Sequence, residues 1–156
     1  MIKMDVEQSI VINLPAEKIS AYVTDVDNLV EWSGAVIAVR KTSTGAMHVG
    51  ETFRSTIRFL GRWRDVIFEV VEFEPGDSLT LKSISGAAPC LFCYRFMPVE
   101  SGETNVSLEA VIHVASGILG LAEPVLARAI RRQLDHDLLT LKDLLEARSS
   151  ICSSTA

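Results

Sequence analysis

Residues 119–148 read LGLAEPVLARAIRRQLDHDLLTLKDLLEAR, and this stretch decides the fold. Its apolar side chains recur at spacings of three and four, which places them along one side of a helix. The stripe comprises Leu119, Ala122, Leu126, Ala129, Ile130, Gln133, Leu134, Leu138, Leu141 and Leu145. A helix over residues 123–147 would be about 37 Å long at about 1.5 Å per residue. Because one helix cannot bury its own stripe, a broad apolar surface must lie opposite.

Length and composition favour one folded domain. The chain has 156 residues, of which 48% are hydrophobic, so a disordered chain is excluded. We predict a single domain over residues 1–148 and a polar, frayed tail over residues 149–156. The net charge of −5 disfavours nucleic acid as a partner. The oligomeric state stays open.

Cysteine usage and the hydropathy pattern bear on the cellular setting. Cys90, Cys93 and Cys152 are too few for a disulfide framework, which favours a reducing, cytoplasmic environment. The most apolar window, residues 111–130, contains charged residues and two glycines. It therefore predicts no membrane span, although it is compatible with peripheral contact with a membrane.

The rest of the chain predicts strands. Residues 3–13 alternate and end before a proline, and two short helices follow, one opened by Pro15 and one over residues 25–32. Six further strands are expected at residues 36–42, 51–60, 63–74, 78–85, 90–99 and 103–113. Their short connections predict hairpins and an antiparallel sheet. With the first strand joined to the last, this gives an α+β fold, a seven-stranded antiparallel sheet curved around the long C-terminal helix.

Alternation within these strands predicts which side chains point inward. Phe53, Ser55, Ile57 and Phe59 share one side of their strand, whereas Arg54 and the residues in phase with it share the other. On the same reasoning, the expected inward positions of later strands are Val66, Phe68, Val70, Leu79, Leu81, Phe92, Tyr94, Phe96, Val106 and Leu108. The sheet therefore presents an apolar face to the terminal helix.

Three segments resemble a known superfamily. They are LPAEKISAYVTDVDNLVEW at 14–32, YRFMPVESGETNVSL at 94–108 and DLLTLKDLLE at 137–146. With the order of the elements, they are similar to the START-like proteins, the polyketide cyclase/dehydrase and lipid-transport superfamily with the helix-grip fold. The resemblance implies a hydrophobic cavity between sheet and helix, which different members use for sterols, lipids, hormones or polyketides. It specifies fold better than function.

The predicted function is the binding of a hydrophobic or amphipathic small molecule in that cavity, without a cofactor. The alternatives are a polyketide cyclase or dehydratase type of enzyme and a module that docks to a membrane or a larger complex; whether any reaction is catalysed stays open. The candidate ligand-binding residues are Trp32, Phe53, Ser55, Ile57, Phe59, Val66, Phe68, Leu81, Phe92, Tyr94, Val106, Leu108, Leu126 and Ile130.

Asp137 and Tyr94 are the two candidate acids or bases. Asp137 lies close to the apolar stripe by helical angle, and a carboxyl group over a cavity would have a raised pKa. The stripe drifts along the helix, however, so we expect Asp137 at its edge, in water or paired with an arginine. Tyr94 and Ser55 are expected to point inward, where each could bind a ligand or be satisfied by backbone or water.

The remaining motifs indicate no catalytic or metal site. Cys90 and Cys93 form a CxxC on a strand, so they should face opposite sides and not share a metal. The three histidines, His48, His113 and His136, show no pairing and are expected at the surface. A basic patch formed by Arg54, Arg58, Arg62 and Arg64 is expected to be a solvated face that could guide an anionic headgroup or a partner.

Overall fold

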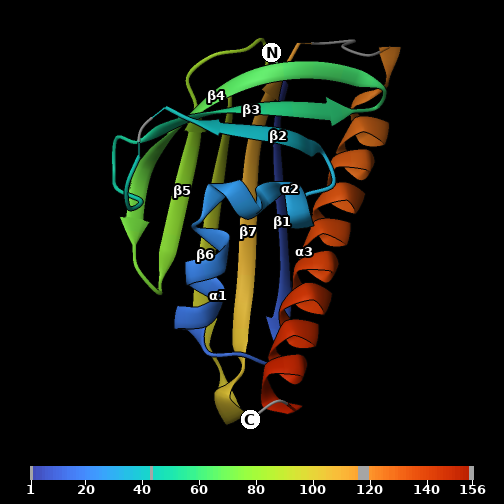
Figure 1. Ribbon diagram of the computed structural model, residues 1–156. Coiled ribbons are helices and arrows are strands. Elements are labelled where there is room, and N and C mark those ends of the chain that lie inside the picture. The colour runs from blue at the N-terminus through green and yellow to red at the C-terminus, as the bar shows by residue number, and fades with distance from the viewer. Residues whose placement is uncertain (1, 43, 116–119, 155–156) are drawn as a thin grey trace.

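A computed structural model describes the backbone of residues 2–42, 44–115 and 120–154, with side chains up to residue 150. Figure 1 shows an antiparallel sheet with the helices on its concave side. The strands are β1 (Ile2–Ile12), β2 (Val36–Lys41), β3 (Thr52–Phe59), β4 (Arg62–Glu74), β5 (Ser78–Ser83), β6 (Cys90–Pro98) and β7 (Thr104–Val114). The helices are α1 (Ala16–Val23), α2 (Leu29–Trp32) and α3 (Glu123–Ser154), with short 3-10 turns η1 (Val26–Asn28) and η2 (Glu100–Gly102).

The seven strands form one sheet in the order β1-β7-β6-β5-β4-β3-β2. Strands β2 to β7 follow one another as hairpins, and β1 pairs antiparallel with β7, from Ile2 opposite Val114 to Ile12 opposite Thr104. The predicted α+β helix-grip architecture is confirmed. The strand boundaries differ from the predicted ones by one or two residues.

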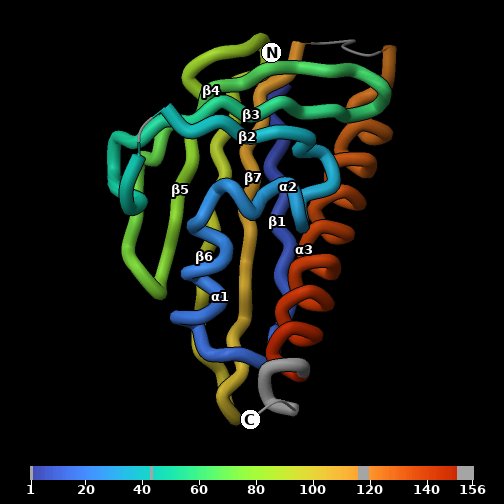
Figure 2. Tube along the Cα trace, in the orientation of Figure 1, coloured from blue at the N-terminus to red at the C-terminus, as the bar shows by residue number. Residues whose placement is uncertain are grey.

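The apolar stripe of α3 packs on this sheet as predicted, except that Ala122 precedes the helix and is exposed. Leu126, Ile130 and Leu134 are buried in its first half, and Leu138, Leu141 and Leu145 in its second half. The helix runs beside β1 along the open edge of the concave face (Figure 2). Leu119 of the predicted stripe lies outside the described residues.

The C-terminal end of α3 differs from the prediction. The helix continues to Ser154, so residues 149–154 are helical where a frayed tail was expected. Polar composition alone was misleading there, because serine tolerates a helix that the preceding turns have already nucleated. Within the described chain, no helix is long and apolar enough to cross a membrane.

The short helices α1 and α2 cover the concave face beside α3 (Figure 1). Pro15 caps α1 with extended backbone, and α1 buries Ile19 and Val23 against the sheet. The side chain of Asp25 accepts a hydrogen bond from the Asp27 amide and caps η1, which leads directly into α2. These helices bring Trp32 over the sheet, where it is almost completely buried.

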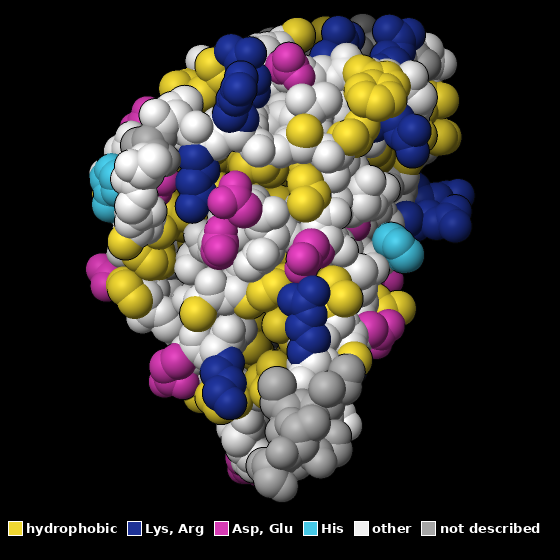
Figure 3. Space-filling model, in the orientation of Figure 1, with side chains coloured by type: hydrophobic (Ala, Val, Ile, Leu, Met, Phe, Trp, Pro, Cys, Tyr) yellow, Lys and Arg dark blue, Asp and Glu magenta, His cyan; other side chains and the backbone are white. Residues whose placement is uncertain are grey.

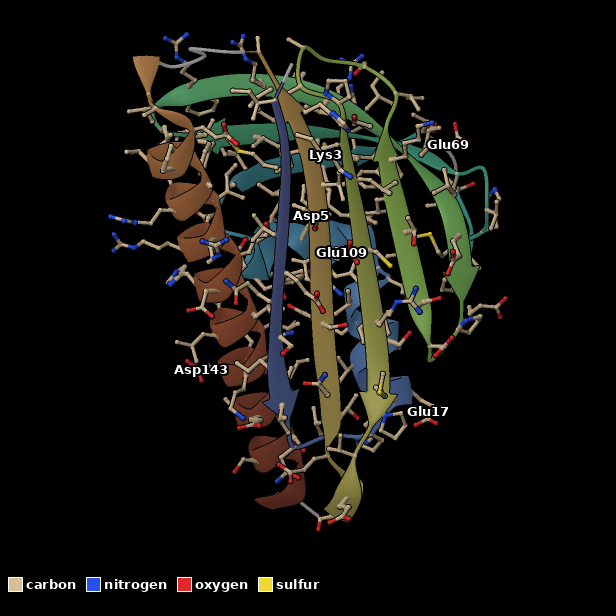
Figure 4. The ribbon with its side chains drawn as sticks, turned by 180° about the vertical axis from the view of Figure 1, so that it is seen from behind. Lys3, Asp5, Glu17, Glu69, Glu109 and Asp143 are labelled. Atoms are coloured by element: carbon tan, nitrogen blue, oxygen red, sulfur yellow. The ribbon has the colours of Figure 1, made fainter. Side chains whose placement is uncertain are left out.

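The convex face of the sheet is polar. Figure 4 shows Lys3 and Asp5 of β1 and Glu109 of β7 on this side, away from the helices. In register, Glu7 lies opposite Glu109, so two acidic residues are neighbours across the strands. This face is the solvated one, as the alternation predicts.

Candidate functional site

A cavity lies between the sheet and α3 and has two adjacent chambers. The outer chamber has a volume of about 240 Å³ and the inner chamber about 100 Å³. They are contiguous because Ala35, Ile57, Gln133 and Leu134 line both. Together they reach the lower part of the range of about 300–1,000 Å³ that is typical of small-molecule sites.

The outer chamber has an almost wholly apolar wall. Its predicted lining residues are Ile57, Phe59, Val66, Leu126 and Ile130, from β3, β4 and α3. Further lining residues come from positions not chosen from the sequence, namely Ala35, Arg62, Arg64, Ala88, Cys90, Ile112, Val114, Gln133 and Leu134. An apolar group of a ligand would gain from burial here.

The four arginines of the predicted basic patch are exposed, as expected of a solvated surface, but the strand register divides them between the two faces of the sheet. Arg62 lies opposite Phe59 and Arg64 opposite Ile57 in the β3–β4 register. Cross-strand neighbours point to the same side, so both arginines are on the concave face, where they line the outer chamber. Arg58 is opposite Trp63 on the convex face, with its guanidinium carbon 5.8 Å from the centre of the indole ring.

The inner chamber contains most of the other predicted residues. Trp32, Phe53, Ser55, Phe68, Leu81, Phe92, Tyr94 and Leu108 line it. Val106 does not belong to either chamber, so its place among the cavity residues is wrong. It points inward as predicted but is fully buried in the packed part of the core.

Asp137 is the main correction to the sequence analysis. Its side chain is only 3% exposed and lines the inner chamber, so it is neither in water nor at the edge of the stripe. The Gly34 amide donates to Oδ1 at 2.9 Å, Gln133 Nε2 donates to the same oxygen at 2.8 Å, and Ser33 Oγ donates to Oδ2 at 3.2 Å. Because the partners are neutral, burial dominates and raises the pKa of the Asp137 carboxyl above its ordinary value.

Gly34 allows the chain after α2 to approach α3 closely. A methyl group at this position would lie 2.8 Å from Gln133 Nε2 and 3.4 Å from Asp137 Oδ1. A residue with a side chain would therefore disturb the hydrogen bonds that hold the carboxylate. The short segment 33–35 is thus fastened to the helix through Asp137.

Three more polar groups surround the inner chamber. The rings of Trp32 and Tyr94 meet edge to face with their centroids 6.1 Å apart. Burial, and then the nearby Asp137 and Cys90, raise the pKa of the Tyr94 hydroxyl, so this group stays protonated. Among the described residues, the buried atoms Trp32 Nε1 and Ser55 Oγ have no hydrogen-bond partner. A polar group of a ligand could satisfy such atoms, which are otherwise costly to bury.

The cysteines and histidines whose side chains are described lie apart from one another. Cys90 lines the outer chamber, whereas Cys93 accepts a hydrogen bond from Thr80 at 3.4 Å on the other face, as the strand alternation predicts. His48 and His136 are exposed, and His113 is half-buried. Over residues 2–42, 44–115 and 120–150, no group of three or more metal-ligating side chains is close enough to hold an ion. Cys152 lies outside the described side chains.

The comparisons with known proteins agree with this architecture. The model of the polyketide cyclase / dehydrase and lipid transport family matches residues 3–146, so this chain belongs to that family. No curated protein matches the chain in sequence. The solved structures are informative about the fold.

Three solved structures share the fold at low sequence identity. TTHA0849 from Thermus thermophilus is 18% identical, with a TM-score of 0.79 over 93% of this chain and 99% of its own. The Zhui aromatase/cyclase from a Streptomyces species is 15% identical, with a TM-score of 0.78 over 95% and 96%. A START superfamily protein from Mycobacterium smegmatis is 14% identical, with a TM-score of 0.78 over 92% and 98%.

Proposed function

We propose that this protein binds an amphipathic small molecule in the cavity between the sheet and α3. The supporting observation is the gradient along the cavity. The outer chamber is apolar with Arg62 and Arg64 in its wall, and the inner chamber ends in Asp137, Tyr94 and Ser55. A ligand with an apolar body would bury it in the outer chamber and place a hydroxyl or carbonyl group among the inner polar side chains.

Ligand binding is tested by filling the cavity. Leu126 is 3% exposed and lines the outer chamber, and the adjacent Val125 is 51% exposed on the outside of α3. In Leu126→Trp the indole can enter the chamber, so we expect most of the stability to be kept. We also expect the variant to lose the binding of an environment-sensitive apolar dye. Val125→Trp adds the same ring outside the cavity and should bind dye normally.

Thermal melts and dye titrations of the parent and both variants measure this. A parent that binds no dye, together with a Leu126→Trp variant destabilised by more than about 3 kcal/mol, would mean that the interior is packed solid. Mass spectrometry of small molecules that co-purify with the native protein then identifies the ligand class. The cytoplasm remains the expected location.

A second candidate function is a cyclase or dehydratase, and the buried acid favours it. Among the described residues, Asp137 Oδ2 accepts a hydrogen bond only from Ser33, so it has room for a proton that could be donated to a ketone oxygen. In an intramolecular aldol condensation, the enol form of one ketone would bond through its α-carbon to the carbonyl carbon of another. Asp137 would give its proton to the carbonyl oxygen, and the enol hydroxyl would return a proton to the carboxylate as it becomes a ketone again. The new hydroxyl group and a hydrogen on the adjacent carbon would then leave as water. The similarity in fold to an aromatase/cyclase is compatible with this candidate.

The two candidates differ in what Asp137→Asn does. A binding protein should keep its ligand and show no turnover with or without the substitution. An enzyme should convert a linear poly-β-keto thioester into a cyclised product, and Asp137→Asn should abolish the conversion while dye affinity is retained. Chromatography of the reaction products distinguishes the outcomes.

A further inference from the structure

The tip of the β3–β4 hairpin carries apolar side chains in an unexpected conformation. The strands are joined by the two residues Leu60 and Gly61, with φ of 50° and 76°. Such a turn needs positive φ at both positions and therefore favours asparagine, aspartate or glycine over leucine. Leu60 adopts it nevertheless while remaining 47% exposed, and Trp63 beside it is 59% exposed.

Arginines surround these exposed apolar groups. Residues 52–64 contain Arg54, Arg58, Arg62 and Arg64 and no acidic residue, in a chain whose net charge is −5. Arg132 of α3 joins them, because it lines a surface groove together with Arg58 and Leu60. Asp135 also lines this groove. Figure 3 shows basic and hydrophobic side chains gathered at the upper right, over the hairpin and the adjoining part of α3.

We propose that this hairpin patch, defined as Arg58, Leu60, Arg62, Trp63, Arg64 and Arg132, docks on the surface of an anionic lipid bilayer. Leu60 and the Trp63 ring would enter the interface between headgroups and acyl chains, where tryptophan is favoured. The arginines would contact the negatively charged headgroups through their long side chains. The contact of Arg58 with the Trp63 ring keeps cation and ring together at the surface.

A bilayer fits the patch better than an elongated polyanion does. The basic residues of the patch are confined to one hairpin and one position of α3, whereas the convex face beyond them carries both signs of charge, with Asp5, Glu7 and Glu109 beside Lys3. Arg62 and Arg64 belong both to the patch and to the outer chamber, so the cavity opens where the bilayer would lie. An apolar molecule could then pass between membrane and cavity without crossing water. Docking itself does not depend on the proposed ligand binding.

The test uses vesicles and no ligand. The intact protein is mixed with vesicles of phosphatidylcholine alone or of phosphatidylcholine with phosphatidylglycerol, and binding is followed by co-sedimentation and tryptophan emission. We expect binding to the anionic vesicles, weakening as salt is added, with a blue shift of the emission. Trp63 should give the blue shift, because Trp32 is buried in the free protein, with 2% of its surface exposed, and its surroundings would not change on docking.

Three variants locate the contact. Leu60→Asn suits the turn, so the protein should remain folded while vesicle binding weakens about fivefold. Arg58→Gln should weaken binding about fivefold as well. Arg95→Gln makes the same charge change on β6 and should leave binding within about twofold.

The proposal is overturned by equal binding to neutral and anionic vesicles, by binding without a blue shift, or by an equal loss in Arg95→Gln and Arg58→Gln. No binding to either vesicle also overturns it and would leave the patch to a protein partner. If the parent protein binds dye but not vesicles, docking alone is refuted. If it binds vesicles but not dye, only the proposed function of the cavity is refuted.

Discussion

Asp137→Asn should make the protein less dependent on pH and more stable at neutral pH. The asparagine has nearly the same shape, and its oxygen can still accept from the Gly34 amide and from Gln133. The substitution thus removes a buried charge while keeping most of the hydrogen bonds. Because burial already raises the pKa of the carboxyl, the charged form is costlier in the folded than in the unfolded protein.

The direction of the pH dependence follows from proton linkage. Since the folded state holds the Asp137 proton more tightly, the stability from this group is fully present below the ordinary pKa of 3.8 and is lost as pH rises through the raised folded pKa. Within that window, one proton changes the free energy of unfolding by at most about 1.4 kcal/mol per pH unit. Asp137→Asn lacks this loss, so the difference in the free energy of unfolding between the variant and the parent should grow with pH and then level off.

Urea unfolding of parent and variant over a pH series, followed by circular dichroism, measures the difference. Other carboxylates with shifted pKa values, such as Glu31 and Glu146, cancel because both proteins contain them. A stability difference that is constant with pH, or that turns against asparagine as pH rises, would refute a raised pKa for Asp137.

Asp137→Ala is the contrasting variant. It leaves Gln133 Nε2 and the Gly34 amide without their acceptor, and one unsatisfied buried donor costs about 1–3 kcal/mol. Gly34 is exposed, so water can replace part of that bond. We therefore expect Asp137→Ala to lower the free energy of unfolding by about 1–3 kcal/mol in total, whereas Asp137→Asn should raise it at neutral pH.

Three further predictions concern the frame of the cavity. Leu141→Ala, at a fully buried position, should lower the free energy of unfolding by about 2–5 kcal/mol. Leu139→Ala, on the exposed side of α3, should change it by at most about 0.5 kcal/mol. Equal denaturation midpoints for the two variants would contradict the packing of α3 on the sheet. Gly34→Ala should displace Gln133 and cost about 1 kcal/mol, and an unchanged melting temperature would argue against the close approach. Thr104→Val keeps the side-chain shape but removes the 2.7 Å hydrogen bond that Thr104 Oγ1 donates to the Leu14 carbonyl oxygen. Calorimetry should therefore show that the free energy of unfolding falls by about 1 kcal/mol.

The sequence predicted the fold because each element carries its own periodic signal. The spacing of the leucines determines the buried side of α3, and alternation in β3 places Phe53, Ser55 and Phe59 on the concave face. Two-residue and other short turns between strands force antiparallel hairpins. The same local rules identified half of the residues in the cavity wall, because many inward-pointing strand positions are also cavity positions.

Tertiary structure alone decided the polar end of the cavity. Helical angle placed Asp137 near the edge of the apolar stripe, but its burial depends on segment 33–35, which folds over it and donates from Ser33 and Gly34. Those residues are over a hundred positions away in sequence, and no periodic pattern reports such a contact. The arginines near Gly61 were likewise adjacent in sequence yet divided by the strand register, which puts Arg62 and Arg64 on the concave face and Arg58 on the convex face. Periodicity records which side of its own element a residue occupies, whereas the partner that covers that side is determined only when the chain folds back on itself.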